Sequence, residues 1–477
     1  MGPDRHISWV GDWWETLLPD EGCVRHWGMA VTLRSLQTAV PPTVLIQEQV
    51  RDVFAAQPGL TRLAQRIVAT SFNVSGIDTR HTVIDELTLD ATGSDPQFFD
   101  PSEQRLLIPS TRVRNELYIV EATKLFVEAG RKALEACPGV TAADVTHVVT
   151  VSCTGFYAPG PDYMLVRELG LSPATQRYHL GFMGCYASMP ALRTAKQFVE
   201  ADPNAVVLVV SAELCSLHLR TSNDPDTIVA SSLFSDGAAA GIVSARPLAL
   251  GERGLNLDLF ETVITPVGEG DMAWKIGDEG FEMVLSTYVP HIIDEHIEGA
   301  LAPLFARDAA LSAVLGAVGE TAALEADLDL ALGLDLAVDR DATESTRPAR
   351  PGRTVTADAT SADTETGAGA SVATLQAPLE VLPAPVSTAI AHWAIHPGGR
   401  SILDKTEAKL GLSEAQLVPS RETLRKHGNM SSATILFVMK EILEAPATAD
   451  GERVCAMAFG PGLTVESGLM TVAVGIG

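Results

Sequence analysis

A cysteine, a histidine and an asparagine are the residues of this chain best placed for chemistry. Cys185 follows Gly184 and precedes a stretch with helical spacing, so its thiol would meet free N–H groups and the positive end of a helix dipole, which lower the pKa of a thiol. Cys185 is therefore a candidate nucleophile, although most free cysteines are simply small buried hydrophobic residues. The chain has six cysteines without a C-x-x-C pair, which fits neither a disulfide scaffold nor a zinc site.

His396 lies at the C-terminal end of an apolar, strand-like run and directly before a Pro-Gly-Gly turn. In open α/β sheets ligands bind at that edge, so we expect its imidazole in a functional site. His392 lies four residues earlier, and two residues at that spacing in a strand are about 13 Å apart. The two histidines are too far apart to share a zinc ion, and the sequence predicts no metal site.

A faint internal repeat relates Asn429 to Cys185. Each follows a glycine and precedes small residues and a helical stretch, and the next strand-like run begins 20 residues after Cys185 and 24 residues after Asn429. Two related β-α-β halves would place both residues at helix N-termini facing one central cleft. Helices that start with small residues are common, so the repeat taken alone is also compatible with chance.

A glycine-rich turn follows the last strand-like run. Gly460 and Gly462 flank Pro461 and would let the backbone approach a ligand or a reacting centre closely. The turn is not a phosphate-binding loop, because it lacks both the Lys-Ser/Thr pair and the G-x-G-x-x-G spacing. Without the other motifs it would be read as an ordinary turn.

The elements that must position these residues alternate between apolar, β-rich runs and helical patterns, as in an α/β architecture with buried strands. The clearest predicted strands are residues 145–153, 205–212, 389–395 and 453–459. Apolar residues at three- and four-residue spacing predict helices over residues 115–136, 162–169, 187–200, 283–305 and 431–444.

The charge and hydropathy of the chain exclude several classes of protein. Its 477 residues carry a formal net charge of −26, which argues against nucleic-acid binding because phosphate neutralisation needs a basic surface. No apolar run reaches the roughly 18 to 20 residues that span a bilayer, and the first residues lack the apolar region of a secretion signal. We therefore expect a cytoplasmic protein without a membrane span.

Residues 307–386 differ in composition from the rest of the chain. They contain no Phe, Trp or Tyr and have 13 Asp and Glu against 5 Arg, so they can bury little apolar surface. We expect an acidic, low-complexity surface insertion here, in which residues 321–338 are the best candidate for a helix. Residues 1–28 are expected to be an N-terminal extension, because the ordered pattern begins near residue 31.

Taken together, the motifs resemble those of the type III polyketide synthases, the chalcone-synthase-like branch of the condensing enzymes with the thiolase fold. Five motifs occur in order, and His396 precedes Asn429 by 33 residues. The resemblance implies an α/β fold of two similar halves, residues 29–250 and 251–477, in a five-layer αβαβα arrangement. The segments that carry it are residues 159–163 (PGPDY), 184–185 (GC), 393–399 (WAIHPGG), 428–432 (GNMSS) and 459–466 (FGPGLTVE).

The resemblance implies a role for each of the three candidate residues. Cys185 would take an acyl group from a CoA thioester and hold the growing chain, and His396 would keep its thiolate ionised as an ion pair. His396 and Asn429 would then donate hydrogen bonds to the thioester oxygen of malonyl-CoA and stabilise the enolate left when CO2 departs. The substrates would be acyl-CoA and malonyl-CoA, and no metal or organic cofactor is implied.

The resemblance also assigns residues around the substrates. Phe234 and Phe281 match two phenylalanines that separate the CoA tunnel from the cavity, with plain core packing as the alternative. Arg66 matches a cationic position that contacts CoA phosphates, and Arg62 is a weaker candidate. Ala158 occupies the position at which plant relatives carry a methionine that reaches into the partner's cavity, so a homodimer is implied. A smaller residue there would leave room for a longer starter.

The expected function is iterative decarboxylative condensation of malonyl-CoA onto an acyl-CoA starter, followed by cyclisation. Residues 183–195 and 213–219 look most like the microbial members that form alkylpyrones and alkylresorcinols. One departure is that Phe281 and His396 are 115 residues apart, further than the family pattern allows, and the extra residues coincide with the insertion. The alternatives are an enzyme like β-ketoacyl-carrier-protein synthase III, which performs one condensation, and a catalytically silent acyl-binding subunit, which would release no CO2 from malonyl-CoA.

Overall fold

The computed structural model describes residues 29–88, 95–313, 387 and 389–476. A nine-stranded sheet runs through them in the order β13-β14-β15-β10-β1-β9-β8-β6-β7. Its strands are β1 (Thr32–Ala39), β6 (His147–Ser152), β7 (Gln176–Gly181), β8 (Val206–Leu214), β9 (Asp236–Ser244), β10 (Arg253–Ile264), β13 (His392–Ile395), β14 (Arg453–Gly460) and β15 (Thr464–Val474).

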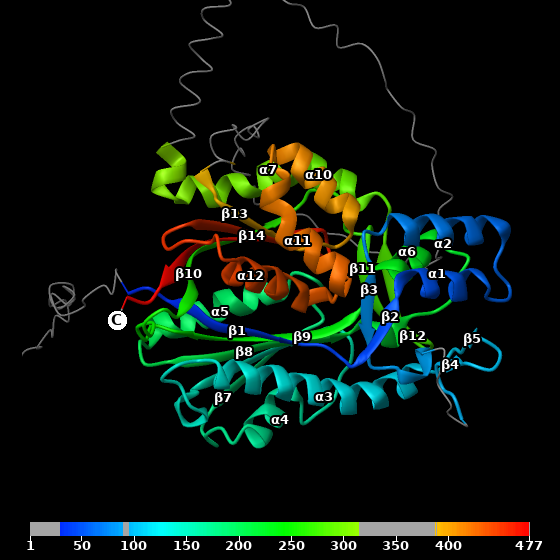
Figure 1. Cartoon of the computed structure of the whole chain (residues 1–477), viewed down its shortest axis with the longest axis horizontal. Coiled ribbons are helices and arrows are strands. Elements are labelled where there is room, and N and C mark those ends of the chain that lie inside the picture. The colour runs from blue at the N-terminus through cyan, green and yellow to red at the C-terminus, as the bar shows by residue number, and fades with distance from the viewer. Residues whose placement is uncertain (1–28, 89–94, 314–386, 388, 477) are drawn as a thin grey trace, which may run out of the picture.

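The sheet and its helices form five layers (Figure 1). Helices α5 and α12 lie in the middle layer, with β1, β8 and β9 on one side and β13 and β14 on the other. Helices α3 and α4 cover one outer face, and α7 and α10 cover the other. The pairing of β1 with β10 joins the two halves into one sheet. The layer helices are α3 (Thr111–Glu135), α4 (Pro161–Glu168), α5 (Ser188–Ala201), α7 (Val289–Arg307), α10 (Arg400–Leu410) and α12 (Thr434–Glu444).

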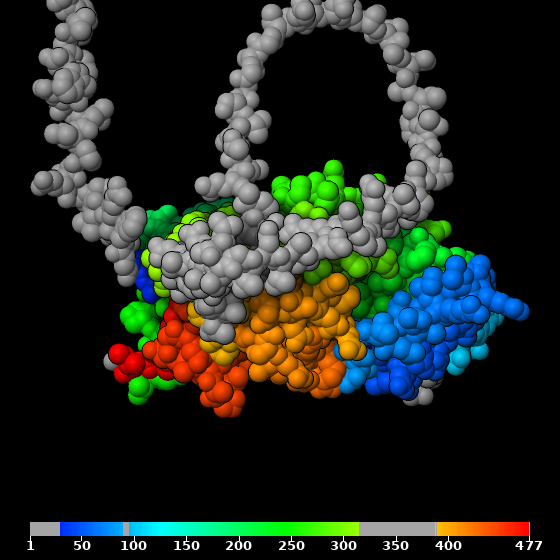
Figure 2. Space-filling view, turned by 90° about the horizontal axis from the view of Figure 1, so that it is seen from above, coloured from blue at the N-terminus to red at the C-terminus, as the bar shows by residue number. Residues whose placement is uncertain are grey.

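The remaining elements lie beside these layers, and Figure 2 shows α10 and α11 (orange) next to the N-terminal segment that includes α1 and α2 (blue). The helices are α1 (Gln47–Ala55), α2 (Arg62–Val74), α6 (Pro225–Leu233) and α11 (Glu414–His427), with short 3-10 turns at Asp85–Leu87, Ala142–Asp144, Cys215–His218 and Ser431–Ala433. Three two-stranded sheets pair β2 (Thr43–Ile46) with β3 (Thr79–Thr82), β4 (Phe99–Asp100) with β5 (Arg105–Leu106), and β11 (Met272–Gly277) with β12 (Gly280–Leu285).

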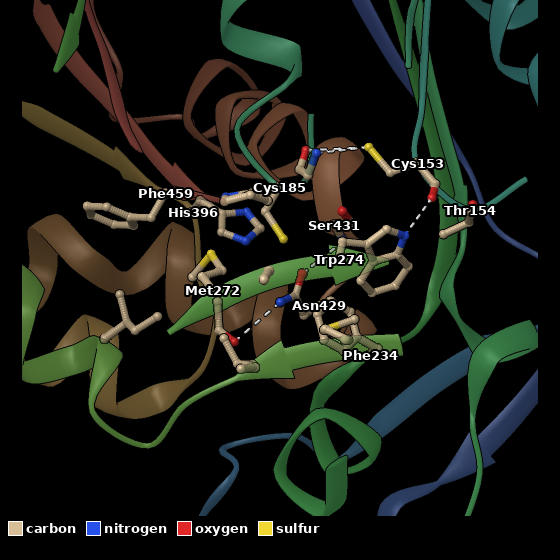
Figure 3. A pocket seen from close by; sticks show the side chains of 17 residues that line it. Cys153, Thr154, Cys185, Phe234, Met272, Trp274, His396, Asn429, Ser431 and Phe459 are labelled. Carbon is tan, nitrogen blue, oxygen red and sulfur yellow. Dashed lines mark hydrogen bonds between the residues drawn. The ribbon is translucent and has the colours of Figure 1, made fainter. Parts of the chain in front are cut away.

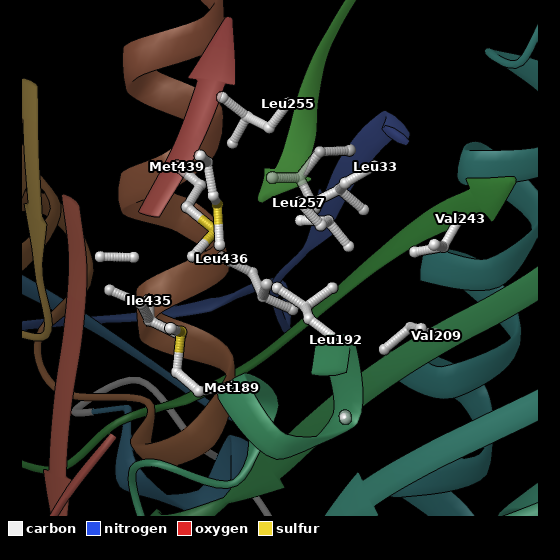
Figure 4. Packing of buried hydrophobic residues seen from close by; sticks show 14 of the residues in the cluster. Leu33, Met189, Leu192, Val209, Val243, Leu255, Leu257, Ile435, Leu436 and Met439 are labelled. Carbon is white, nitrogen blue, oxygen red and sulfur yellow. The ribbon is translucent and has the colours of Figure 1, made fainter. Parts of the chain in front are cut away.

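Buried apolar side chains fill the spaces between the layers. In the central space Leu192 of α5 and Leu436 of α12 pack against Leu33 and Val209 of the sheet (Figure 4). Strand β8 is buried along its whole length, which explains why its sequence is an apolar run without alternation. Truncating Leu192 or Leu436 to alanine would cost about 2 to 5 kcal/mol of the free energy of unfolding.

The predicted strands are confirmed within a few residues as β6, β8, β13 and β14, and the predicted helices over 115–136, 162–169, 187–200 and 431–444 as α3, α4, α5 and α12. The helix predicted over 283–305 is wrong at its start. Residues 283–285 belong to β12, which pairs in register with β11, and α7 begins only at Val289. Apolar side chains on one face of this short strand fall at a spacing that also fits a helix, and only the pairing with β11 distinguishes the two.

The predicted domain organisation falls partly outside the described residues. The expected N-terminal extension, residues 1–28, lies there, and so do the suggested helix over 321–338 and almost all of the expected insertion over 307–386. The expected boundary between residues 250 and 251 falls in the connection from β9 to β10.

Candidate active site

One pocket brings Cys185, His396 and Asn429 together, and Figure 3 shows their side chains pointing into it. They arrive from three places: the loop before α5, the end of β13, and the turn between α11 and α12. Phe234 and Met272 are among the apolar residues around them, and none of the described residues that line the pocket has a charged side chain. The site is therefore a largely apolar cavity with a few convergent polar groups.

The loop that carries Cys185 depends on close packing against the glycine-rich turn after β14. Gly184 has a φ of +79°, and a Cβ at that position would lie 2.4 Å from the Cδ of Pro461. A Cβ on Gly460 would lie 2.2 Å from the ring of Tyr186. Pro461 itself lines the pocket, whereas Gly462 supplies a turn with φ +103°. The turn therefore acts as a close support for the cysteine loop.

His396 is placed by the end of β13, where its backbone N–H donates to the carbonyl of Met457 at 2.8 Å. The side chain is 1% exposed, and neither ring nitrogen has a hydrogen-bond partner among the described residues. A buried polar group without a partner is costly, which favours a role for these nitrogens toward a bound molecule.

Asn429 is held in one orientation by its neighbours. Its Oδ1 accepts from the backbone N–H of Ser431 at 2.8 Å, and its Nδ2 donates to the carbonyl of Gly398 at 3.3 Å. Because Oδ1 is bonded to an N–H group, which can only donate, the assignment of oxygen and nitrogen is fixed. The carboxamide therefore offers its second N–H as a donor in the pocket.

The sequence predicted a lowered pKa for the Cys185 thiol, and this prediction is wrong for the thiol considered by itself. Burial raises the pKa of Cys185 to about 12, and polar contacts with Ser431 and Asn429 only partly offset this. Burial also lowers the pKa of His396 to about 3. Cys185 lies two residues before the N-cap of α5, so the helix end is too weak to compensate for lost hydration.

The sequence analysis missed Glu213, a buried carboxyl group at the end of β8. Its Oε2 accepts from the backbone N–H of Cys153 at 2.8 Å and from Thr154 Oγ1 at 3.0 Å, and Ser432 donates to its Oε1. Burial raises the pKa of Glu213 to about 7. Cys153 and Thr154 line the pocket, so Glu213 supports its wall from behind. The signal in the sequence was a carboxylate that ends an otherwise apolar strand.

The β11–β12 hairpin forms the opposite wall. Met272, Trp274 and Met283 project from one face of it into the pocket, and Trp274 Nε1 donates to the carbonyl of Cys153 at 3.1 Å. Phe234 lines the same pocket, as expected. Phe281 does not: it lines a neighbouring cavity, where it stacks on His218 with ring centroids 4.1 Å apart. Met283 of the same hairpin lines both the cysteine pocket and this neighbouring cavity.

The other expected residues lie away from the pocket. Arg66 is exposed on α2, and so is Arg62. Ala158 is exposed in the loop between β6 and α4 and precedes a cis peptide bond to Pro159. Neither Arg66 nor Ala158 contacts the three central residues, and a role for either needs a bound CoA or a second subunit.

Groups of His, Cys, Asp and Glu that could hold a metal ion are absent from the described residues. The same part of the chain contains no helix that is long and apolar enough to cross a membrane. Cys153, Cys185 and Cys215, the three cysteines nearest the site, are free thiols.

Two solved structures share the fold of this chain. The fold is similar to that of PKS-I from the brown alga Ectocarpus siliculosus, with 22% identity, a TM-score of 0.69, and 93% of this chain and 98% of that chain covered. It is also similar to the C-terminal type III polyketide synthase domain of Steely1, a type I/III hybrid from Dictyostelium, with 24% identity, a TM-score of 0.68, and 93% and 99% covered.

The family relation comes from models of two domains. The model of the N-terminal domain of chalcone and stilbene synthases matches residues 21–247, and the model of the C-terminal domain matches residues 387–474. Together they cover about two thirds of the chain in the order in which the domains occur in the family. The chain therefore belongs to the chalcone and stilbene synthase family, the type III polyketide synthases, which are acyltransferases.

Proposed function

We propose that the protein condenses malonyl-CoA with an acyl-CoA starter through Cys185, His396 and Asn429. The observation that carries the proposal is the pocket itself, which holds a thiol, an imidazole without a hydrogen-bond partner among the described residues, and a carboxamide that contacts the thiol. These are the groups that acyl transfer and enolate stabilisation need.

Acylation would begin when the Cys185 sulfur attacks the thioester carbonyl of the starter. The thiol proton passes to His396, a C–S bond forms to Cys185, and the C–S bond to CoA breaks. The departing CoA sulfur takes a proton back from His396. The acyl group is then held as a thioester in the pocket.

Extension would use the same site with different donors. The thioester oxygen of malonyl-CoA accepts hydrogen bonds from His396 and from the Nδ2 of Asn429. Loss of CO2 leaves an enolate, whose carbon attacks the acyl carbonyl and displaces the Cys185 thiolate. These steps need no metal or organic cofactor, because the malonyl carboxylate supplies the carbanion.

The lining of the pocket favours an aliphatic starter. Phe234, Met272, Trp274, Met283 and Leu285 provide apolar walls without a charged side chain. Because Phe234, Trp274 and Met283 also line the neighbouring cavity, a long acyl chain could extend past them. We propose a long-chain acyl-CoA starter and a pyrone or resorcinol product, with Arg66 as a contact for the phosphates of CoA.

We further propose that the protein is a homodimer paired through β7. This strand is the edge of the nine-stranded sheet, and its first four residues are exposed. Tyr178 of β7 is 38% exposed and Phe156, in the nearby loop that contains Ala158, is 40% exposed. A second copy pairing antiparallel with this strand would satisfy its open backbone groups and bring each Ala158 loop to the other subunit.

The test is a series of acyl-CoA starters with malonyl-CoA, followed by mass analysis of the products and of the protein. We expect a starter adduct on Cys185 and cyclised polyketides, and we expect Cys185→Ala to make none because Cys185 is the proposed carrier of the acyl group. Labelling of Cys153 or Cys215 with Cys185 unmodified would reject the assignment. A single condensation product would favour the synthase III-like alternative, and absence of CO2 release would favour a silent subunit.

A further inference from the structure

A buried arginine outside the pocket is bonded to backbone that carries a pocket residue. Arg80 of β3 is 1% exposed, and its Nη1 donates to the carbonyls of Ser231 at 2.8 Å and Phe234 at 2.9 Å. Its Nε and Nη2 have no partner among the described residues. Burial lowers the pKa of Arg80 to about 10, so the side chain still carries its charge at neutral pH.

Phe234 and Asn429 are joined backbone to backbone by a short parallel bridge. The N–H of Asn429 donates to the carbonyl of Leu233 at 2.9 Å, and the N–H of Ser235 donates to the carbonyl of Asn429 at 2.9 Å. The side chains of both Phe234 and Asn429 line the pocket. A shift of the backbone at residues 233–235 would therefore move the carboxamide of Asn429 as well.

Strand β3 supports this bridge at two consecutive residues. Gly428 has a φ of +71°, and a Cβ there would lie 3.0 Å from the Cγ of Arg80, so the arginine packs directly under the residue before Asn429. At the next position, Ser235 Oγ accepts from the N–H of His81 at 2.9 Å and donates to its carbonyl at 3.1 Å.

A guanidinium with two unpaired nitrogens is a costly way to fill buried space, because an apolar side chain would fill it without losing hydration. The guanidinium lies over the ring of Phe72, 5.5 Å from its centroid, and is attracted to Asp236, but its hydrogen bonds within the described residues are two strong ones to one short segment. We propose that Arg80 is a positioning residue that fixes the Phe234–Asn429 bridge, so that the Asn429 carboxamide is aimed at the enolate oxygen. The inference rests on the proposed function of Asn429 and concerns decarboxylation, not the loading of Cys185.

The test compares the two half-reactions in Arg80→Met. We expect acyl loading of Cys185, followed by intact-protein mass, to stay within about threefold of wild type, while CO2 release from malonyl-CoA falls about 10- to 100-fold, the size expected for a misplacement near 1 Å. Arg80→Lys keeps a cation and N–H donors and should recover part of the CO2 release. Equal losses in both half-reactions, or full CO2 release, would overturn the proposal.

Arg34→Lys is the matched control for Arg80→Lys. Arg34 is also 1% exposed, but it pairs with Glu252 and the carbonyl of Pro138, which do not line the pocket, so the ratio of the two rates should stay at the wild-type value. If Arg80→Met does not fold, Ser235→Ala removes the second tie to β3 and should show the same split to a smaller extent. Asn429→Ala measured alongside distinguishes the two proposals: unchanged CO2 release in that variant would reject the function proposed for Asn429 itself.

Discussion

At the scale of single residues, the thiol and the imidazole are each disfavoured as ions on their own. Burial raises the pKa of Cys185 and lowers that of His396, so an isolated thiolate or imidazolium would lack hydration in this cavity. In the proposed mechanism each charged form would be stabilised by the other, so we expect the reactivity of the cysteine to depend on the histidine.

This dependence predicts the pH profile of His396→Gln. Without the imidazole, the Cys185 thiol keeps the pKa of about 12 that burial gives it, so the thiolate fraction rises with pH over the whole accessible range. Inactivation by iodoacetamide should be slower than in wild type at pH 7 and should gain about tenfold per pH unit up to pH 10. Rates measured at several pH values with mass analysis of the adduct test this. Identical profiles in the two proteins would show that His396 does not share the thiol proton.

At the scale of elements, the β11–β12 hairpin forms one wall of the pocket around the cysteine. It is a separate two-stranded sheet, and it is held by backbone as well as side-chain hydrogen bonds: the N–H of Thr111 donates to the carbonyl of Asp278 at 2.8 Å, and the N–H of Gly462 to the carbonyl of Met272 at 3.3 Å. Trp274 binds the Cys153 carbonyl, and Thr111 at the start of α3 donates to the Gly277 carbonyl and accepts from the Gly280 N–H. One face of the hairpin is therefore a fixed wall. In the proposed function its side chains would limit the size of the starter.

The hairpin predicts a change in starter choice for Met283→Trp. Met283 lines both the cysteine pocket and the neighbouring cavity, so a larger side chain there should block an acyl chain that extends from one into the other. We expect activity with short acyl-CoA starters to persist and activity with long ones to fall at least about tenfold, as steric exclusion costs more than 1.4 kcal/mol. The control is Glu282→Gln, since Glu282 lies exposed on the other face. If Met283→Trp accepted the same starters as the wild type, the acyl chain of the starter would have to lie along another route.

The same elements show which features of the site the sequence could reveal. Cys185, His396 and Asn429 were predictable because each lies beside a local signal, a glycine or a Pro-Gly-Gly turn at the end of an element. Met283 was not, because its position depends on pairing between segments distant in the sequence. Glu213 had a local signal, a carboxylate at the end of an apolar strand, but its partners Cys153 and Ser432 are distant in the sequence. The pattern around Met283 fits a helix as well as a strand, and β11 alone decides between them. Pairing between distant segments therefore explains why the predicted helix over 283–305 began too early. It also explains why the hairpin wall of the pocket was not predicted.

At the scale of the whole molecule, the exposed edge of the sheet bears on assembly. The proposed homodimer predicts that Tyr178→Glu in β7 shifts the protein toward monomers, because a charge would be buried against its copy. Sedimentation at several protein concentrations measures this. Tyr288→Glu, at an exposed tyrosine before α7, is the matched control and should leave the assembly unchanged. A monomeric wild type would contradict the proposal directly.

The acidic segment between the two matched domains is the other feature of the whole chain. The N-terminal family model ends at residue 247 and the C-terminal one begins at 387. Buried residues lie on either side of residues 314–386, Leu311 at 4% and Ser387 at 5% exposed. Helix α7, which lies between the two matched domains, packs Ile292, Ile293 and Leu301 into the core, so it belongs to the fold. Only the part beyond it has the composition of an insertion.

The last prediction is that replacing residues 314–385 by a short Gly/Ser linker leaves a folded and active enzyme. The segment has no aromatic residue and a strong excess of acidic ones, so we expect little apolar burial from it, and loop-closure entropy changes slowly with length. The free energy of unfolding should change by about 1 kcal/mol, which moves the melting temperature by only a few degrees. Calorimetry and the product profile are the measurements. Loss of cooperative melting would show that the segment is structural, whereas normal melting with altered product lengths would show that it limits which starters enter.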